Sequence, residues 1–419
     1  MSDELVAKPR SASLEEKSLG VPLSGIRVLD FSHILAGPFC TRLLADVGAD
    51  IVRVETVSRP DHLGERKAGS ESKSRPDRPP SFLNINRSKR SIAINLKTDA
   101  GRELVTRLAS VADVVVENFS AGVMDRLQLG YDHLRPLNPR LIYVSMSGYG
   151  HNGPRRNWTS MNMNLQAYTG LMMTTGSEND PPIAISNSWN DYMGGFHACF
   201  GILQVLTERN KTGVGANLDL SQCESSVATL GALMVHSAVN RSLPQRLGSR
   251  STQVAPQGVY RCAGADEWCA ISIQNDEQWR VLVGAMGSPS WATAPRLETV
   301  LGRIGAHDEI DSQIEAWTSQ LKNTEVESRL KRVGISAERM RRIKDIIDSP
   351  DSGHAFQPME DPKRGPIMAT GVPFTFSRSH LAPLWPAPSL GEHTREVLHD
   401  WLGVTDSEFA DLERQGMLV

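Results

Sequence analysis

Short apolar runs alternate with amphipathic segments through the first third of this 419-residue chain. Five of the runs have the β-branched composition of strands: residues 26–31, 50–55, 91–96, 111–117 and 140–146. Helical patterns separate them, such as those at 36–44 and 100–110. The run at 111–117 is nearly continuous, as in a strand buried on both faces of a parallel sheet. Strands alternating with helices predict a doubly wound α/β sheet.

The pattern changes in the second half of the chain. Residues 191–208 predict a long, mostly apolar helix, and the polar residues 241–256 predict a linker. A hairpin centred on Gly264, followed by amphipathic helices, begins a second, α+β domain at about residue 257. Polar residues 1–20 predict a flexible arm.

Chemistry is expected where the strands end, because ligands of open α/β sheets bind beyond the carboxyl ends of the strands. In this chain those ends are residues 32–36, Thr56, Lys97, 118–119 and 147–150. No G-x-G-x-x-G sequence follows the first strand, which argues against a nicotinamide dinucleotide site.

Composition argues against several classes of partner and site. Apolar residues make up 40% and charged residues 22%, and the net charge of −3 gives no reason to expect a nucleic-acid or membrane partner. The five cysteines include no C-x-x-C pair, so no metal site is predicted. Without a secretory signal or an apolar run of roughly 20 residues, a cytoplasmic protein is expected.

Several groups of residues, in this order along the chain, resemble CoA-transferase family III, which includes formyl-CoA transferase and the carnitine CoA-transferases. They are 23–31 with 36–38 and 48–55, then 86–92, 116–119 with 125–126, 137–143 before 147–150, and 388–398. The resemblance implies a Rossmann-like large domain from both chain ends (21–240 and 371–419). A smaller domain (257–370) is inserted between them, and two chains form an interlocked dimer.

The resemblance also implies which residues bind CoA, which is a substrate here and not a prosthetic group. They are Leu35, Ala36, Asn95, Leu96, Lys97, Asn118, Phe119 and Arg126. Arg126 is the first choice for a phosphate contact, although it and Lys97 also fit solvated helix-end charges. The basic cluster Arg87, Lys89 and Arg90 fits either a phosphate contact or a surface face. Thr56 departs from formyl-CoA transferase, which has an arginine there.

Family chemistry needs a carboxylate nucleophile, and counting from Pro154 and from Gly170 places Asn162 at that position. An amide carries no negative charge and cannot take this role. Three explanations are open. A related partner subunit carries the aspartate, as in the heteromeric succinyl-CoA:benzylsuccinate CoA-transferase; Asn162 is an introduced substitution; or another carboxylate serves. Asp191 is the candidate for the last, although it also fits a cap of the helix that follows.

Two other functions of the same fold are open. A scaffold subunit without catalysis is one, and an acyl-CoA racemase is the other, for which His151 is one of two acid/base groups needed. Apolar and aromatic residues near the site favour a bulky or aryl acid such as benzylsuccinate as acceptor, with succinyl-CoA as donor. These residues are Trp158, Met161, Met163, Tyr168, Trp189 and Tyr192, and they also fit an ordinary core.

Overall fold

The computed structural model describes residues 20–56, 61, 79–350, 355–362 and 365–418. The predicted arm lies almost wholly outside these residues. The described chain divides into two compact units. The first comprises the residues up to 165, then 188–228 and 355–418, and the second comprises 166–187 and 229–350. The first unit therefore contains residues from both ends of the chain.

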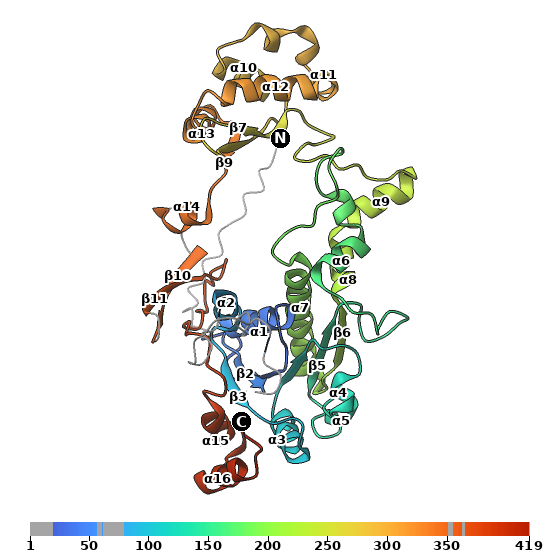
Figure 1. The fold of residues 1–419 in the computed structure, drawn as a ribbon, viewed down its shortest axis with the longest axis vertical. Coiled ribbons are helices and arrows are strands. Elements are labelled where there is room, and N and C mark those ends of the chain that lie inside the picture. The colour runs from blue at the N-terminus through green and yellow to red at the C-terminus, as the bar shows by residue number, and fades with distance from the viewer. Residues whose placement is uncertain (1–19, 57–60, 62–78, 351–354, 363–364, 419) are drawn as a thin grey trace, which may run out of the picture. The chain divides into compact units, whose positions relative to one another are not determined.

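Six parallel strands form the sheet of the first unit, in the order β3-β2-β1-β4-β5-β6 (Figure 1). Their bounds are β1 (Arg27–Asp30), β2 (Asp50–Glu55), β3 (Arg90–Ala93), β4 (Val114–Glu117), β5 (Ile142–Ser147) and β6 (Asn217–Ser221). The predicted doubly wound sheet is confirmed. Strand order reverses between β1 and β4, and open α/β sheets typically bind their ligands at such a point.

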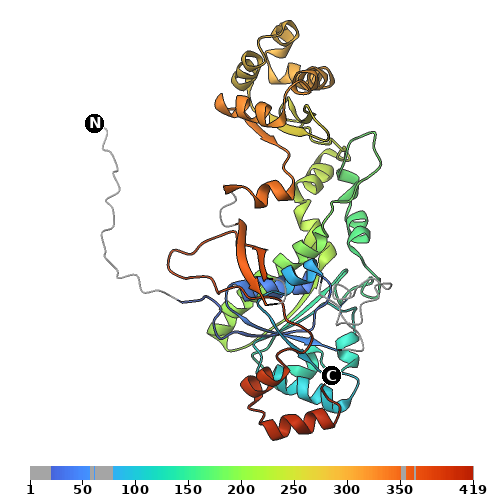
Figure 2. The same cartoon turned by 60° about the vertical axis from the view of Figure 1, so that its left-hand side comes forward.

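Alternate residues of the strands face two separate cores. Val28 packs with α1 (Ala36–Asp46) and α7 (Trp189–Thr212) on one face of the sheet. Leu29 packs on the other face with α3 (Asp99–Ser110), α15 (Thr394–Leu402) and α16 (Asp406–Arg414). The last two helices lie near α3 in both cartoon views (Figures 1 and 2). The end of the chain thus covers a sheet that the beginning builds.

Shorter elements complete this unit: α2 (Pro80–Asn86), α4 (Val123–Arg126), α5 (Tyr131–Leu134), β10 (Phe356–Asp361) and β11 (Gly365–Thr370). The last two strands pair as an antiparallel hairpin. This hairpin was not predicted from the sequence, because residues 349–391 are rich in proline and glycine. Helices α6 (Asn162–Thr169) and α8 (Gln222–Thr229) run from the first unit into the second.

The second unit is built on the antiparallel sheet of β7 (Gln257–Arg261), β8 (Trp268–Ser272) and β9 (Ser336–Arg339). The hairpin predicted around Gly264 is confirmed, and β9 was not expected. Its helices are α9 (Gly231–Asn240), α10 (Asp276–Ala285), α11 (Val300–Gly305), α12 (His307–Thr318), α13 (Asn323–Arg332) and α14 (Ile343–Ile347). No helix in the described part of the chain is both long and apolar enough to cross a membrane.

Candidate active site

Asn118 joins the two strands at which the sheet order reverses. Its Oδ1 accepts the backbone N–H of His33 at 2.8 Å, and its Nδ2 donates to the His33 carbonyl at 2.7 Å. The His33 ring meets Phe119 edge to face, with centroids 5.3 Å apart. Asn118 and Phe119, after β4, are therefore held against the turn that follows β1. This is the edge of the sheet at which CoA was expected.

The turn after β1 leads directly into α1. Leu35 is half-buried at the N-cap position, and Ala36 is buried as the first helical residue. Gly37 allows this tight path, since a Cβ there would lie 2.2 Å from the Ser32 Cβ and 3.5 Å from the Asn118 Cγ. The structure thus brings Leu35 and Ala36 together with Asn118.

Two residues were considered for the nucleophile, Asn162 and Asp191. Only Asp191 has a carboxylate, and it lies on helix α7. The helix begins at Trp189, after Asn187 and Ser188, which both have positive φ (60° and 54°). Asp191 is its third residue and donates its N–H to the Ser188 carbonyl at 2.9 Å. The prediction that Asp191 caps this helix is wrong, because Ser188 occupies the N-cap position. Two consecutive left-handed residues that are not glycine mark a strained turn of the kind found at functional sites.

Close packing of α7 on α1 sets the position of Asp191. Gly195 faces α1, where a Cβ would lie 2.6 Å from Phe39 Cδ1 and 3.0 Å from the Ala36 carbonyl. Both helices run from the carboxyl edge of the sheet to its opposite edge, so they run in the same direction. One helical turn before Gly195, Asp191 therefore comes to the level of the α1 N-terminus.

Burial changes the acidity of Asp191. Loss of water around the carboxylate raises its pKa to about 6, although its own backbone N–H partly opposes this shift. The group is ionised at neutral pH and is more basic than an ordinary aspartate. Such a carboxylate is suited to attack a thioester carbonyl.

Asn162, at the position counted for the nucleophile, lies next to this turn. Its Oδ1 accepts the backbone N–H of Asn190 at 3.4 Å, so it contacts the residue that precedes Asp191. The Asn190 side chain is fully buried, and within the described chain neither its Nδ2 nor its Oδ1 has a hydrogen-bond partner. Asn162 and Asp191, 29 residues apart, thus belong to one small region of the first unit.

The other residues implied for CoA lie further along the same edge. Asn95 follows β3, two strands from β1, and its N–H donates to the carbonyl of Met417 near the end of the chain. Leu96 is partly buried against the core, and Lys97 is exposed. Arg126 is exposed at the end of α4 with its Nη1 above Gly122. Lys97 and Arg126 are therefore accessible cations.

The basic cluster before β3 is used within the protein. Arg87 is buried and binds Asp46 at 2.8 Å, and Arg90 binds Asp50 at 2.6 Å. Lys89 is buried and binds Asp30 at 3.2 Å, and its loss of water lowers its pKa to about 8. Arg87 and Lys89 serve buried ion pairs, and Arg90 pairs with partly exposed acids, so the structure favours the phosphate contact for none of the three.

A buried acid and a histidine fix Phe119 and were not singled out as a pair in the sequence. Glu117 accepts the Phe119 N–H at 2.8 Å, while His151 Nε2 lies 3.3 Å from the Phe119 carbonyl oxygen. The same nitrogen lies 3.7 Å from Glu117 Oε1. Burial raises the pKa of Glu117, and His151 opposes that shift. Both polar groups of the Phe119 backbone are thereby held.

The chain belongs to CoA-transferase family III, whose family model matches residues 23–394. Enzymes of this class move CoA between carboxylic acids.

Named relatives cover almost the whole chain. Succinyl-CoA–D-citramalate CoA-transferase of Chloroflexus aurantiacus is 32% identical over 403 residues, which cover 95% of this chain and 98% of the relative. The beta subunit of succinyl-CoA–L-malate CoA-transferase from the same organism is 31% identical, with 95% and 98% covered. A CAIB/BAIF family protein from Brucella suis has a similar crystal structure, with a TM-score of 0.84, 27% identity, and 91% and 100% of the chains covered.

Proposed function

We propose that this chain carries out CoA transfer itself, from succinyl-CoA to a bulky dicarboxylic or aryl-bearing acid, with Asp191 as nucleophile. One observation carries the proposal: an ionisable carboxylate with a pKa of about 6 sits at the carboxyl edge of the sheet, level with the α1 N-terminus. The named relatives supply the choice of donor, since both Chloroflexus enzymes are named for succinyl-CoA.

The proposed reaction uses the Asp191 carboxylate twice. One carboxylate oxygen attacks the donor thioester carbon and expels the CoA thiolate, which leaves a mixed anhydride. The thiolate then attacks the Asp191 carbonyl, so that succinate leaves and an aspartyl-CoA thioester remains. The acceptor carboxylate repeats the exchange in reverse: it displaces the thiolate to form a new anhydride. The thiolate attacks the acceptor carbonyl, and Asp191 is regenerated.

CoA itself is proposed to bind along the β1–β4 crevice. Asn118 and Phe119 lie against the turn that leads into Leu35 and Ala36, which supports a binding slot at this edge of the sheet. Lys97 and Arg126 are the accessible cations proposed for the phosphates, with Asn95 and Leu96 beside Lys97. Cationic side chains bind phosphate well.

Exposed apolar residues support a bulky acceptor. Trp158, Met161 and Met163 are 54%, 63% and 63% exposed, so they are not part of the core of this unit. Trp189 and Tyr192 are half-buried beside Asp191 on α7. Side chains of this kind favour an acid with apolar or aryl surface over formate.

The test uses the chain purified alone. Succinyl-CoA and a panel of acids, including benzylsuccinate, are incubated with it and the new thioesters are measured. Asp191→Asn is expected to reduce turnover by at least about 1,000-fold, as loss of a covalent nucleophile does. In the unmodified chain, kcat/KM should rise as pH increases through about 6 and then level off, because only the ionised carboxylate attacks. Hydroxylamine added during turnover should leave a hydroxamate on Asp191, seen by mass spectrometry.

A silent subunit of a heteromer is the second candidate, favoured by Asn162 at the counted position and by the relative that is named a beta subunit. Asn162→Asp separates the two. A silent subunit should gain activity from the new carboxylate. With Asp191 as nucleophile, activity should fall instead and the pH midpoint should rise, because a second negative charge beside Asp191 opposes its ionisation.

A further inference from the structure

Side-chain oxygens occupy three consecutive backbone N–H groups in the turn between β1 and α1. Ser32 donates to Asp30 Oδ1 at 2.9 Å, His33 to Asn118 Oδ1 at 2.8 Å, and Ile34 to Asp61 Oδ1 at 3.0 Å. Phosphate-binding turns present such N–H groups to the ligand. This turn has them bound to protein instead, so it contributes shape to the crevice and not backbone donors for a phosphate.

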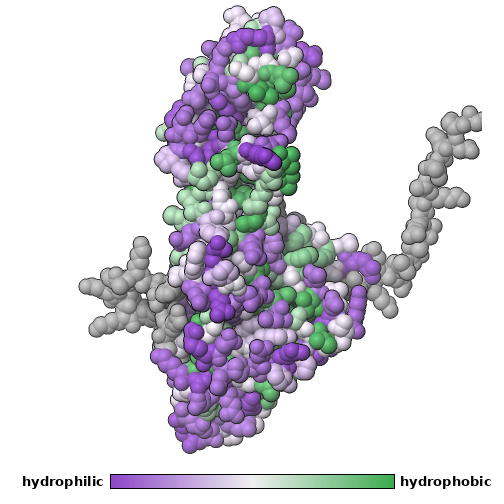
Figure 3. Space-filling view, turned by 90° about the vertical axis from the view of Figure 1, so that its right-hand side faces the viewer, coloured by the Kyte–Doolittle hydropathy of each residue, from purple (hydrophilic) through white to green (hydrophobic). Residues whose placement is uncertain are grey.

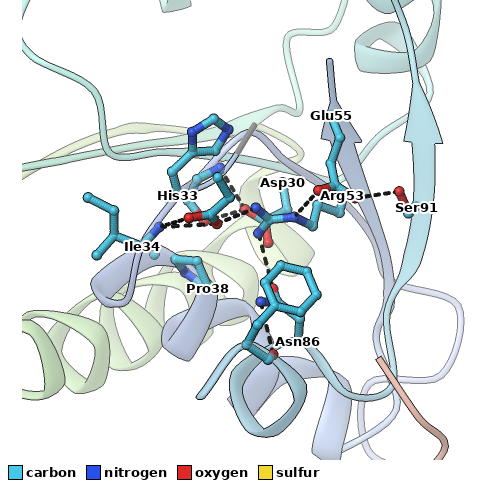
Figure 4. Close-up of polar contacts among 12 residues, drawn as sticks. Asp30, His33, Ile34, Pro38, Arg53, Glu55, Asn86 and Ser91 are labelled. Carbon is cyan, nitrogen blue, oxygen red and sulfur yellow. Dashed lines mark hydrogen bonds and ion pairs between the residues drawn. The ribbon is translucent and has the colours of Figure 1, made fainter. Parts of the chain in front are cut away.

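Ile34 is the strained residue of the turn. Its φ is 67°, in the left-handed region that β-branched residues rarely adopt. Such a conformation is unfavourable and persists only where surrounding contacts enforce it. The side chain is partly exposed and points away from the polar cluster in Figure 4. The enforcing contact must therefore act on the backbone of Ile34.

Asp61 makes that contact and is itself held by a buried arginine. Both of its carboxylate oxygens lie within 3.2 Å of the Ile34 N–H, and Oδ2 binds Arg53 Nη2 at 2.5 Å. Arg53, on β2, is fully buried and reaches Asn86 at 3.0 Å and Glu55 at 3.4 Å (Figure 4). A rigid strand is thereby coupled to the conformation of one residue in the turn.

We propose that Asp61 and Arg53 are positioning residues for CoA: they hold Ile34 in the left-handed conformation that directs Leu35 and Ala36 along the crevice. This inference rests on the proposed function, because it concerns the same CoA slot. Neither residue needs to touch CoA or the reacting atoms. Without the Asp61 carboxylate, Ile34 relaxes to negative φ and the start of α1 shifts away from Asn118.

Binding of free CoA, measured by titration calorimetry, tests this without requiring turnover. Asp61→Ala is expected to weaken CoA binding about tenfold, which corresponds to about 1.4 kcal/mol. Asp46→Ala is the matched control: it removes a buried aspartate from an arginine pair at the other end of α1, where Arg87 lies 2.8 Å away. It should lower thermal stability similarly and change CoA affinity by less than about twofold. Asp61→Leu, which has a similar size but no oxygen to accept the Ile34 N–H, replaces the alanine variant if that variant does not fold.

A double-mutant cycle with Ile34→Gly gives the decisive readout. Glycine adopts positive φ without strain, so removal of the Asp61 carboxylate should matter less in that background. We expect the effect on CoA affinity to fall from about tenfold to below about threefold. An equal effect in both backgrounds, or unchanged affinity in the folded Asp61 variant, would overturn the positioning role alone. An unmodified chain that binds no CoA would overturn both this role and the proposed function.

Discussion

Burial of the Asp191 carboxylate lowers the stability of the fold, and the proposed reaction depends on that burial. Its carboxylate is largely withdrawn from water, and its neighbours offer little to offset that loss. A carboxylate kept only for stability would be paired with a cation, as Asp46 is with Arg87 and Asp50 with Arg90. Unfavourable burial of an ionisable group is therefore evidence for a functional role.

Burial of Asp191 predicts how the stability of the chain changes with pH. The folded-state pKa of Asp191, about 6, lies above the ordinary value of 3.8, so between these values the folded chain binds more protons than the unfolded chain. Its contribution to stability therefore falls as pH rises through this window. Asp191→Asn should be more stable than the unmodified chain by about 1–3 kcal/mol at pH 8, and the difference should vanish near pH 4. Denaturant unfolding at both pH values measures it.

A matched control is Asp180→Asn, since Asp180 is an exposed aspartate of the second unit. It should change unfolding free energy by less than about 0.5 kcal/mol at either pH, as surface substitutions do. A stability gain for Asp191→Asn that persists unchanged at pH 4 would contradict ionisation as its cause.

Some residues of the site could be predicted from the sequence and others could not. The strand ends indicated Leu35, Ala36, Asn118 and Phe119, and the structure places these together because parallel strands end at a common edge. The buried pairing of Arg87 and Lys89 with aspartates 41 and 59 residues away was not visible, since a basic run looks the same whether buried or exposed. Asp61 could not be predicted either, because only folding brings it to Ile34, 27 residues away.

At the scale of elements, periodicity identified most of what builds the large sheet. Buried parallel strands have continuous apolar runs, and the β1–β5 series stood out for that reason. The β10–β11 hairpin did not, because it is half exposed and contains Pro358 and Pro366 in its strands. Helix α7 was recognised but its start was placed at Asp191, two residues late, since Ser188 and Asp191 both fit a cap by residue type.

The close contact between α7 and α1 predicts that a larger residue at Gly195 lowers both stability and turnover. Gly195→Ala would place a Cβ 2.6 Å from Phe39 Cδ1 and 3.0 Å from the Ala36 carbonyl, so the helices must separate. We expect a loss of about 1–3 kcal/mol in unfolding free energy, typical of overpacking. Turnover should fall by about 100-fold, because displacement of Asp191 by roughly an ångström is costly to catalysis.

Gly201→Ala on the same helix is the comparison. A Cβ there meets only Leu218 Cδ1, at 3.4 Å, which is an ordinary contact. Since alanine is also the better helix former, stability should be unchanged or higher by up to about 1 kcal/mol, with full activity. Equal loss in the two variants would show that helix α7 tolerates neither change, against a specific role for the α7–α1 contact.

Helix α9, in the second unit, has an apolar surface that a single chain does not bury. No residue of this apolar helix is buried, and Val235 and Val239 are 63% and 73% exposed. Figure 3 shows several hydrophobic patches on the face that it draws. Apolar surface of this extent commonly marks an interface.

We therefore expect the chain to self-associate through α9, in keeping with the interlocked dimer that the family resemblance implies. Val235→Glu with Val239→Glu should weaken this association, because two charges would be buried without partners at the interface. Light scattering after gel filtration should show a dimer for the unmodified chain and a smaller mass for the variant. Leu301→Glu, a similar change at a 79% exposed position on α11, should leave the dimer intact. An unmodified chain that stays monomeric, and becomes active only after a related chain is added, would instead favour the heteromeric alternative, with α9 as the surface that receives the partner.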